Sequence, residues 1–344
     1  MAKKSVVNSI VFQEALSIPE RMLNFIDTDE NNYSNVSKIL SSKKISNVIT
    51  IARGTSDNVA LFSSYIITKY FGLPVSSLPP SLITLEKSDI NFSKSIVIII
   101  SQSAKSQDLI ECARKVKKMG GQSILITNNL KSPLIKYCDH LLNINAGVEI
   151  GIAATKTFVL SLMIILKIIG NSFNKETDRQ INVLANRLNQ DENKHWSASK
   201  VNRRIHNGFI ISRGLGLPLA YEIALKFKEL AQEFMFPYSS AEVFHGPRSL
   251  IDKNTKIFSV TMRDKSSGSI SKDLKKISKL TPYNYEFSTK FDLKNNFYSN
   301  VSPNSFLDPL LIMTKFYPWI INYTFLKGLD PDKPRYLKKV TNTF

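Results

Sequence analysis

Residues 101–108 carry the side chains best suited to holding a small ligand. They read Ser-Gln-Ser-Ala-Lys-Ser-Gln-Asp and follow the apolar run 96–100. Leu109, Ile110 and Val116 then recur at helical spacing, so the pattern predicts a buried strand that ends here and a helix that begins here. Such serines are often only turn and cap residues, but hydroxyls at a helix N-terminus also bind phosphate. Because the GxxxxGK[ST] pattern of nucleotide-binding loops is missing, a sugar phosphate fits better than a nucleotide.

A second group of residues is suited to moving protons. Glu222, Lys226 and Glu229 are spaced by four and then three residues, which places them on one stripe of a helix. A solvated ion-pair face is the ordinary reading of such a stripe. However, His245 follows in a His-Gly-Pro turn, and a carboxylate and an imidazole beside a sugar phosphate suit proton abstraction next to a carbonyl.

Two further loops carry small or hydroxyl residues directly after apolar runs. One contains Gly54-Thr55-Ser56, and the other runs from Glu149 to Lys156. In open parallel sheets, ligands bind at the carboxyl ends of the strands. We therefore expect these two loops and the serine loop, residues 101–106, to lie along one sheet edge.

The elements that must position these residues alternate between strand and helix. The first half predicts strands at 47–52, 95–100, 123–127 and 141–144, and helices at 58–70, 107–118, 133–138 and 156–169. The second half predicts strands at 207–212, 256–262 and 284–287, and helices at 217–234, 270–280 and 307–326. Apolar strands alternating with helices are typical of a parallel sheet covered on both faces.

The two halves also resemble each other. Arg53-Gly54 and Arg213-Gly214, 160 residues apart, each close a strand and open a helix. The sequence therefore predicts an α/β fold of two related domains. The second half lacks the triple-serine loop, so we expect one phosphate site per chain, in the first half.

The composition limits the classes of function. A hydrophobic content of 43% suits a globular chain. The net charge of +18 comes from lysines scattered along the sequence, which favours steering of anionic metabolites over nucleic-acid binding. Two cysteines and no clustered ligands predict no disulfide framework and no metal. Without a GxGxxG motif or a long apolar run, we expect no cofactor, no membrane partner and a cytoplasmic location.

The chain resembles proteins with sugar isomerase (SIS) domains. It is similar to the isomerase half of the glutamine–fructose-6-phosphate aminotransferases, and closer to the stand-alone glucosamine-6-phosphate deaminases built on that half. The landmarks run in order along almost the whole chain: Arg53-Gly54-Thr55-Ser56, Ser101-Gln102-Ser103, 149–158, Arg213-Gly214, 222–229, His245-Gly246-Pro247 and 332–339. The resemblance implies two tandem SIS domains, each a five-stranded parallel sheet in a flavodoxin-like, three-layer arrangement.

The resemblance also implies roles for individual residues. The implied phosphate and substrate set is Thr55, Ser56, Ser101, Gln102, Ser103 and Ser106, with Ile152 and Ala154 lining the sugar. Glu229 matches the base that moves a proton between C1 and C2, and Lys226 matches the lysine beside it. His245 matches the ring-opening histidine, which in this family reaches into the neighbouring subunit of a homodimer. Lys339 matches the lysine that forms a Schiff base in the aminotransferases.

The resemblance also gives the expected domain organisation. The expected order is an N-terminal helical segment (1–30), a first SIS domain (31–172), a linker helix (173–200), a second SIS domain (201–328) and an active-site tail (329–344).

The chain departs from the family in two places. The family usually has Gly at position 104, where this chain has Ala104, and Lys105 adds positive charge to the serine loop. The first predicted strand begins near Asn47 and residue 2 is alanine, so we expect no glutaminase domain and no glutamine hydrolysis.

Without channelled ammonia, release of ammonia is the expected direction. The sequence thus predicts deamination of glucosamine 6-phosphate to fructose 6-phosphate. Another aminosugar-phosphate deaminase, a deglycase and an aldose–ketose isomerase remain alternatives on the same scaffold. A non-catalytic sugar-phosphate sensor is the alternative of another class.

Overall fold

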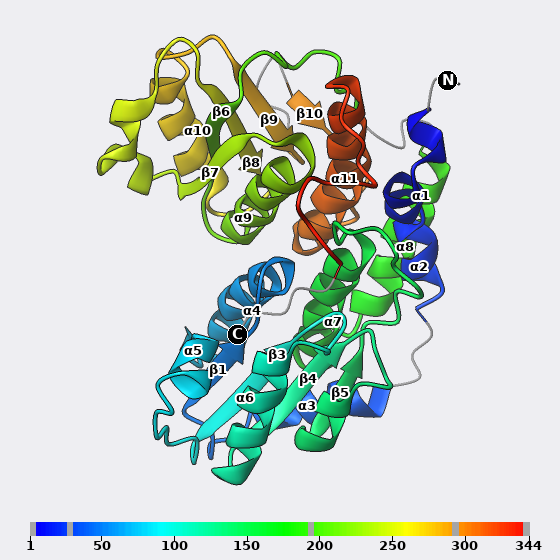
Figure 1. Cartoon of the computed structure of the whole chain (residues 1–344), viewed down its shortest axis with the longest axis vertical. Coiled ribbons are helices and arrows are strands. Elements are labelled where there is room, and N and C mark those ends of the chain that lie inside the picture. Colours follow the sequence, from blue (N-terminus) through cyan, green and yellow to red (C-terminus); the bar gives the residue numbers. More distant parts are fainter. Residues whose placement is uncertain (1–4, 26–29, 192–195, 291–295, 340–344) are drawn as a thin grey trace. The chain divides into compact units, whose positions relative to one another are not determined.

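The computed structural model describes residues 5–25, 30–191, 196–290 and 296–339. They form two compact units, each centred on one sheet (Figure 1). The first-sheet unit comprises the described residues of 24–149, 157–179 and 338–344. The second-sheet unit comprises those of 1–23, 150–156 and 180–337. The domain boundaries given above stay a prediction.

The first-sheet unit contains five parallel strands in the order β2-β1-β3-β4-β5. The strands are β1 (Asn47–Ile51), β2 (Val75–Ser77), β3 (Ser95–Ile100), β4 (Gln122–Thr127) and β5 (His140–Asn143). The helices are α3 (Glu30–Leu40), α4 (Thr55–Phe71), α5 (Pro80–Thr84), α6 (Gln107–Lys118), the 3-10 helix η2 (Pro133–Tyr137) and α7 (Lys156–Phe173). Ile99 packs in a core with α6, whereas the neighbouring Ile98 faces the other side and is also buried. Both faces of the sheet are therefore covered.

The second-sheet unit repeats this arrangement, with the strand order β10-β9-β8-β6-β7 and all pairs parallel. The strands are β6 (Asn207–Ser212), β7 (Phe234–Ser239), β8 (Lys256–Thr261), β9 (Asn284–Ser288) and β10 (Asn296–Tyr298). The helices are α1 (Ile10–Leu16), α2 (Ile18–Leu23), α8 (Thr177–Gln190), α9 (Gly216–Lys226), the π-helical turn η3 (Phe227–Ala231), α10 (Ser267–Ile277) and α11 (Asp308–Leu326). Short 3-10 helices are η1 (Val6–Asn8), η4 (Glu242–Phe244), η5 (Pro247–Leu250) and η6 (Ser305–Leu307).

An aromatic cluster fills the core beside the second sheet. Phe258 of β8 stacks on Phe287 of β9 at 5.4 Å between ring centroids, and Trp319 of α11 meets Phe287 edge-on at 5.0 Å. Phe227 lies 5.0 Å from Phe258. These large buried rings hold α11 and the end of α9 against the sheet.

In both units the strand order reverses between the first and third strands of the sheet, β1 and β3 or β6 and β8. Loops after these strand pairs flank the crevice where open α/β sheets bind ligands. The predicted fold class, two parallel five-stranded sheets flanked by helices, is confirmed. Among the described residues, no helix is long and apolar enough to cross a membrane.

One predicted helix is wrong at its end. The expected helix 217–234 is instead α9, the π turn η3 and a left-handed residue, Gln232 (φ +55°), followed by strand β7. Because apolar side chains continue at helical spacing through Phe227 and Leu230, the sequence pattern does not show where α9 ends.

Candidate functional site

The serine loop follows β3 and ends at the first turn of α6, as its sequence predicts. The neighbouring chain fixes it through its carbonyl groups, because Asn128 N donates to the Gln102 carbonyl and Asn129 Nδ2 donates to the Ser103 carbonyl. Ser106 is the N-cap residue of α6 but its side chain makes no capping hydrogen bond. The loop therefore has an anchored backbone, with serine hydroxyls beside the N-terminal N–H groups of a helix.

Ala104 gives the loop its tight turn. Its φ is +47°, a left-handed conformation that favours glycine. The Ser101 hydroxyl accepts a hydrogen bond from Ala104 N at 3.1 Å, and Ser132 Oγ donates to the Ala104 carbonyl at 2.5 Å. These contacts hold an alanine in a backbone conformation that favours glycine.

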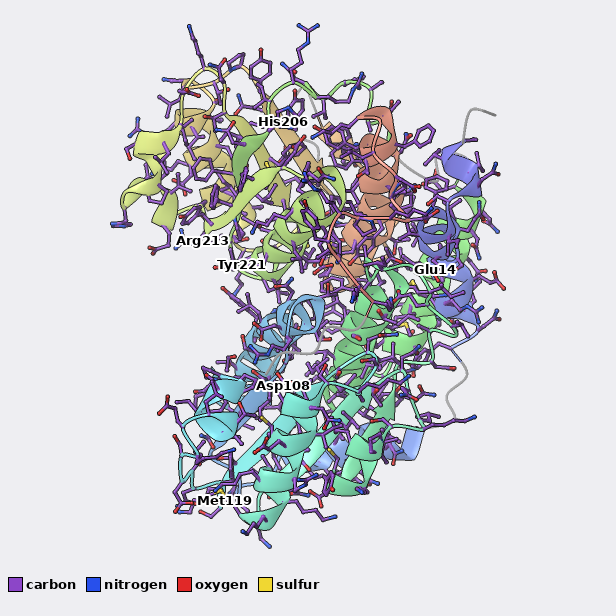
Figure 2. All side chains as sticks on the ribbon, in the orientation of Figure 1. Glu14, Asp108, Met119, His206, Arg213 and Tyr221 are labelled. Carbon is purple, nitrogen blue, oxygen red and sulfur yellow. The ribbon has the colours of Figure 1, made fainter. Side chains whose placement is uncertain are left out.

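The loop after β1 lies next to the serine loop, because β1 pairs directly with β3. Gly54 caps α4 with φ +53° and ψ −129°, a backbone conformation suited to glycine. Half-buried Thr55 and Ser56 begin the helix. Arg53 joins the two loops by an ion pair with Asp108 at 3.0 Å. Asp108, labelled in Figure 2, is buried in the first turn of α6.

The second-sheet unit contains a chain of charged groups. Lys226 Nζ lies 2.6 Å from Glu229 Oε2 and 3.2 Å from Glu222 Oε1, and Tyr317 donates to Glu222 at 3.0 Å. The side chains of Lys226 and Glu222 are fully buried, whereas that of Glu229 is 22% exposed. Glu229 lies in the π turn η3, and such turns are frequent at functional sites.

The charge of Lys226 is retained despite its burial. Burial alone lowers the pKa of this lysine, but the carboxylates of Glu222 and Glu229 outweigh it and raise the pKa above its ordinary value. The ammonium is therefore a fixed positive charge that orients Glu229.

His245 follows η4 in the turn that its sequence predicts. It is exposed, and Gly246 after it has φ +130°. Ile152 and Ala154 are half-buried in the second-sheet unit, within the loop that precedes α7.

Lys339 binds the carboxylate of Glu149, a partner that the sequence did not predict. In the first-sheet unit, Lys339 Nζ donates to Glu149 Oε2 at 3.1 Å. The buried Glu149 also accepts from the Thr157 backbone N–H and hydroxyl at the start of α7. Glu149 therefore ties the predicted Schiff-base lysine to a helix N-terminus.

No group of three or more His, Cys, Asp or Glu side chains arranged for a metal ion occurs in the part of the chain that the structure describes.

The candidate residues form two sets, one in each unit. The first-sheet unit holds Thr55, Ser56, Ser101, Gln102, Ser103, Ser106 and Lys339, and the second-sheet unit holds Ile152, Ala154, Lys226, Glu229 and His245.

Comparison with known proteins identifies a domain within the chain. Residues 39–169 match the SIS domain family. This part of the chain is a SIS domain. Over 98% of its length the chain is 27% identical to a glutamine–fructose-6-phosphate aminotransferase (isomerizing) of Sulfurisphaera tokodaii, of which it covers 57%.

Two solved structures are similar to the chain over nearly its whole length. A Silicibacter pomeroyi protein assigned as a phosphosugar isomerase is 28% identical, with a TM-score of 0.79 over 94% of this chain and 100% of that one. A glucosamine-6-phosphate deaminase from Thermotoga maritima shares the fold, with 20% identity and a TM-score of 0.76 over 97% and 100% of the chains. The chain thus spans little more than half the length of the aminotransferase and the whole length of both solved proteins.

Proposed function

We propose that this SIS-domain protein converts glucosamine 6-phosphate and water into fructose 6-phosphate and ammonia. The observation that carries the proposal is the partly exposed carboxylate of Glu229, held at 2.6 Å by a fully buried ammonium. A carboxylate fixed in this way can take a proton from a substrate and return it without changing position.

The serine loop is the proposed phosphate site. Ser101, Ser103 and Ser106 supply hydroxyls, and the N-terminus of α6 supplies N–H groups and a favourable dipole. Hydrogen bonds to a charged group contribute about 1.5–3 kcal/mol each. Exposed Lys105 adds positive charge nearby.

Glu229 is the proposed proton carrier. With the sugar ring opened with help from His245, Glu229 takes the proton from C2 of the aldehyde form. Water protonates O1 of the resulting enolate, and the same carboxyl group then protonates C1, which leaves a protonated imine at C2. Water adds to C2 and the C–N bond breaks, giving the ketose and ammonia.

The lysines have separate proposed roles. Lys226 keeps the Glu229 carboxylate oriented through their ion pair. Lys339, which donates to Glu149, is proposed to contact the open-chain sugar. Ile152 and Ala154 are proposed to line the sugar, and we propose that the enzyme works as a cytoplasmic homodimer.

The names of the relatives support an amino group at C2. One relative is an aminotransferase acting on fructose 6-phosphate, and a protein of the same fold is a glucosamine-6-phosphate deaminase. In this proposal the chain runs the reaction toward free ammonia.

A coupled assay for ammonia tests the proposal. The wild type should release ammonia from glucosamine 6-phosphate and not from galactosamine 6-phosphate. Glu229→Gln should lower kcat by about 10²–10⁴-fold, the usual contribution of a general base, while sugar-phosphate binding persists. Glu176→Gln, the same change at an exposed carboxylate, is the matched control.

Other outcomes separate the alternatives. Ammonia from the galactosamine epimer alone, or ketose formation without ammonia, would indicate another enzyme on the same scaffold. Binding without turnover across a panel of hexosamine phosphates would indicate a sensor. Full activity of Glu229→Gln would remove this carboxylate from the mechanism.

A further inference from the structure

The loop before α7 is gripped by a residue far away in the sequence. Glu14 of α1, labelled in Figure 2, accepts hydrogen bonds from the backbone N–H groups of Ile150 and Gly151, at 2.5 and 3.1 Å. Each carboxylate oxygen takes one N–H, and Glu14 is 8% exposed. A buried carboxylate bonded to two successive N–H groups strongly fixes the backbone between them.

Gly151 is shaped to this contact. A Cβ atom on Gly151 would lie 2.7 Å from Glu14 Oε2 and 3.1 Å from Val11 Cβ. Its φ is not in the left-handed region, so glycine is needed here for space and not for backbone conformation. The loop and α1 are therefore in the closest contact that the backbone allows.

The helix that carries Glu14 is itself anchored. Asp332 accepts hydrogen bonds from the Ser9 hydroxyl and from the N–H groups of Ile10 and Val11, at 2.9–3.1 Å. Val11, Phe12 and Ala15 are buried, and α1 packs against α11. Glu14 thus extends from a fixed support within the second-sheet unit.

We propose that Glu14 is a positioning residue for sugar binding, acting through the backbone of Ile150 and Gly151 on Ile152 and Ala154. This inference rests on the proposed function, because it takes Ile152 and Ala154 to line the sugar. Glu14 contacts no substrate in this account. It sets the position of the next residues of the loop, and a displacement of about 1 Å in a substrate-positioning group costs up to about 100-fold in kcat/KM.

Glu14→Gln is the most conservative test. The amide keeps the size of the side chain but turns one of its two acceptors into a donor that faces an N–H group. We expect amide hydrogen exchange at Ile150 and Gly151 to accelerate about tenfold or more. We also expect KM for glucosamine 6-phosphate to rise about tenfold, as loss of one charge-assisted hydrogen bond implies, with kcat within about threefold.

Gly151→Ala approaches the same contact from the opposite side. Its Cβ pushes on Glu14, so this variant should raise KM as Glu14→Gln does. In a Glu14→Ala background the 2.7 Å contact is gone and the Val11 contacts at 3.1–3.2 Å remain, so the effect of Gly151→Ala on KM should be at least about threefold smaller. This coupling is independent of how well either single variant folds.

Two controls separate positioning from general loosening of α1. Glu20→Gln, at an exposed carboxylate of α2, should change nothing. Ser9→Ala weakens the α1 N-cap and leaves Glu14 in place, so it should raise KM less than Glu14→Gln. Equal effects of Ser9→Ala and Glu14→Gln would overturn the proposal, because the effect would then come from the helix as a whole.

The remaining outcomes are also decisive. Faster amide exchange at Ile150 and Gly151 in Glu14→Gln with an unchanged KM would make Glu14 a structural anchor only. Unchanged exchange in this variant would show that Glu14 does not hold the loop, which would overturn the proposal. If the Ile150 and Gly151 amides of the wild type are protected but the protein neither binds nor turns over any sugar phosphate, the proposed function fails. The hold of Glu14 on the loop is then still supported, but its role in sugar binding is overturned.

Discussion

The loop after β3 and the loop after β8 occupy equivalent places, each between a central strand and the helix that follows. The third residue beyond the strand is Ser103 in one and Asp264 in the other. Asp264 Oδ1 already accepts from the backbone N–H and the hydroxyl of Ser266, at 2.8 and 2.6 Å. An internal carboxylate therefore accepts from two donors of this loop in the second-sheet unit, and its charge would repel an anion there.

The second loop is also closed by its neighbours. Ser266 Oγ donates to the carbonyl of Arg213, which Figure 2 labels in the loop after β6. In the first-sheet unit Ser101 and Ser103 accept from backbone N–H groups of their own loop. The carboxylate of Asp108 pairs with Arg53 and accepts from the Leu109 N–H. Because Asp264 puts a carboxylate where the first loop has Ser103, we propose that the fold, used twice, has one phosphate site, at the serine loop.

Replacing the arginine that pairs with a buried carboxylate beside each loop tests this contrast through stability. Arg263 contacts the fully buried Asp308 through its Nε and Nη2 atoms. Arg263→Met leaves that carboxylate uncompensated and should lower the free energy of unfolding by about 3 kcal/mol. Arg53, half exposed, pairs with Asp108, so Arg53→Met should cost only about 1 kcal/mol. Urea denaturation measures both, and equal losses would contradict a more tightly closed second loop.

The opposite ends of the same two strands differ in charge. β3 begins with Ser95, which donates to Asn47, whereas β8 begins with the buried Lys256, which contacts Glu233 at 2.6 Å. Burial lowers the pKa of Lys256 to about 8, Glu233 partly offsets this, and Lys327 adds to it.

The pH dependence of stability follows from this shift. Between about pH 8 and pH 10.5 the folded chain has lost the Lys256 proton while the unfolded chain keeps it, so raising the pH favours the folded state. Relative to Lys256→Met, the wild type should gain about 2–3 kcal/mol across this range. Shifted groups remote from Lys256, such as Cys112, are common to both proteins and cancel. Denaturation at several pH values measures the difference, and a flat difference would contradict the low pKa.

The smallest expected effect concerns Ala104, the left-handed residue of the serine loop. Ala104→Gly loses a buried methyl but relieves the backbone strain at φ +47°, so the free energy of unfolding should change by less than about 1 kcal/mol. Ala113→Gly, at a buried position inside α6, has no strain to relieve and should cost about 1 kcal/mol more. Equal costs would show that Ala104 is not strained.

Sequence patterns predicted the parts of the fold that local chemistry determines. The bounds of β3, α6 and β6 were predicted correctly because a continuous apolar run and an amphipathic helix each produce a clear period. Strand β8 was predicted at 256–262, within one residue of its observed end, for the same reason. Edge strands β2, β7 and β10 were missed, since short strands with partly exposed faces give no such period.

The candidate site was predicted in the same uneven way. The contact of Lys226 with Glu222 and Glu229 follows from helical spacing, and the structure shows it. Tyr317, 95 residues from Glu222, and Glu149, 190 residues from Lys339, are brought to their partners only by the tertiary fold. The hydrogen bonds of Glu14 belong to the same class, because nothing local to α1 indicates which backbone it meets.

The central claim is that the chain has one sugar-phosphate site, at the serine loop. Calorimetric titration with glucosamine 6-phosphate of the wild type, Ser103→Asp and Asp264→Ser tests it most directly. The account predicts one site per chain in the wild type, at least about tenfold weaker binding in Ser103→Asp through the lost hydrogen bond and the added charge, and unchanged binding in Asp264→Ser. Retained affinity in Ser103→Asp, or affinity lost only in Asp264→Ser, would contradict it.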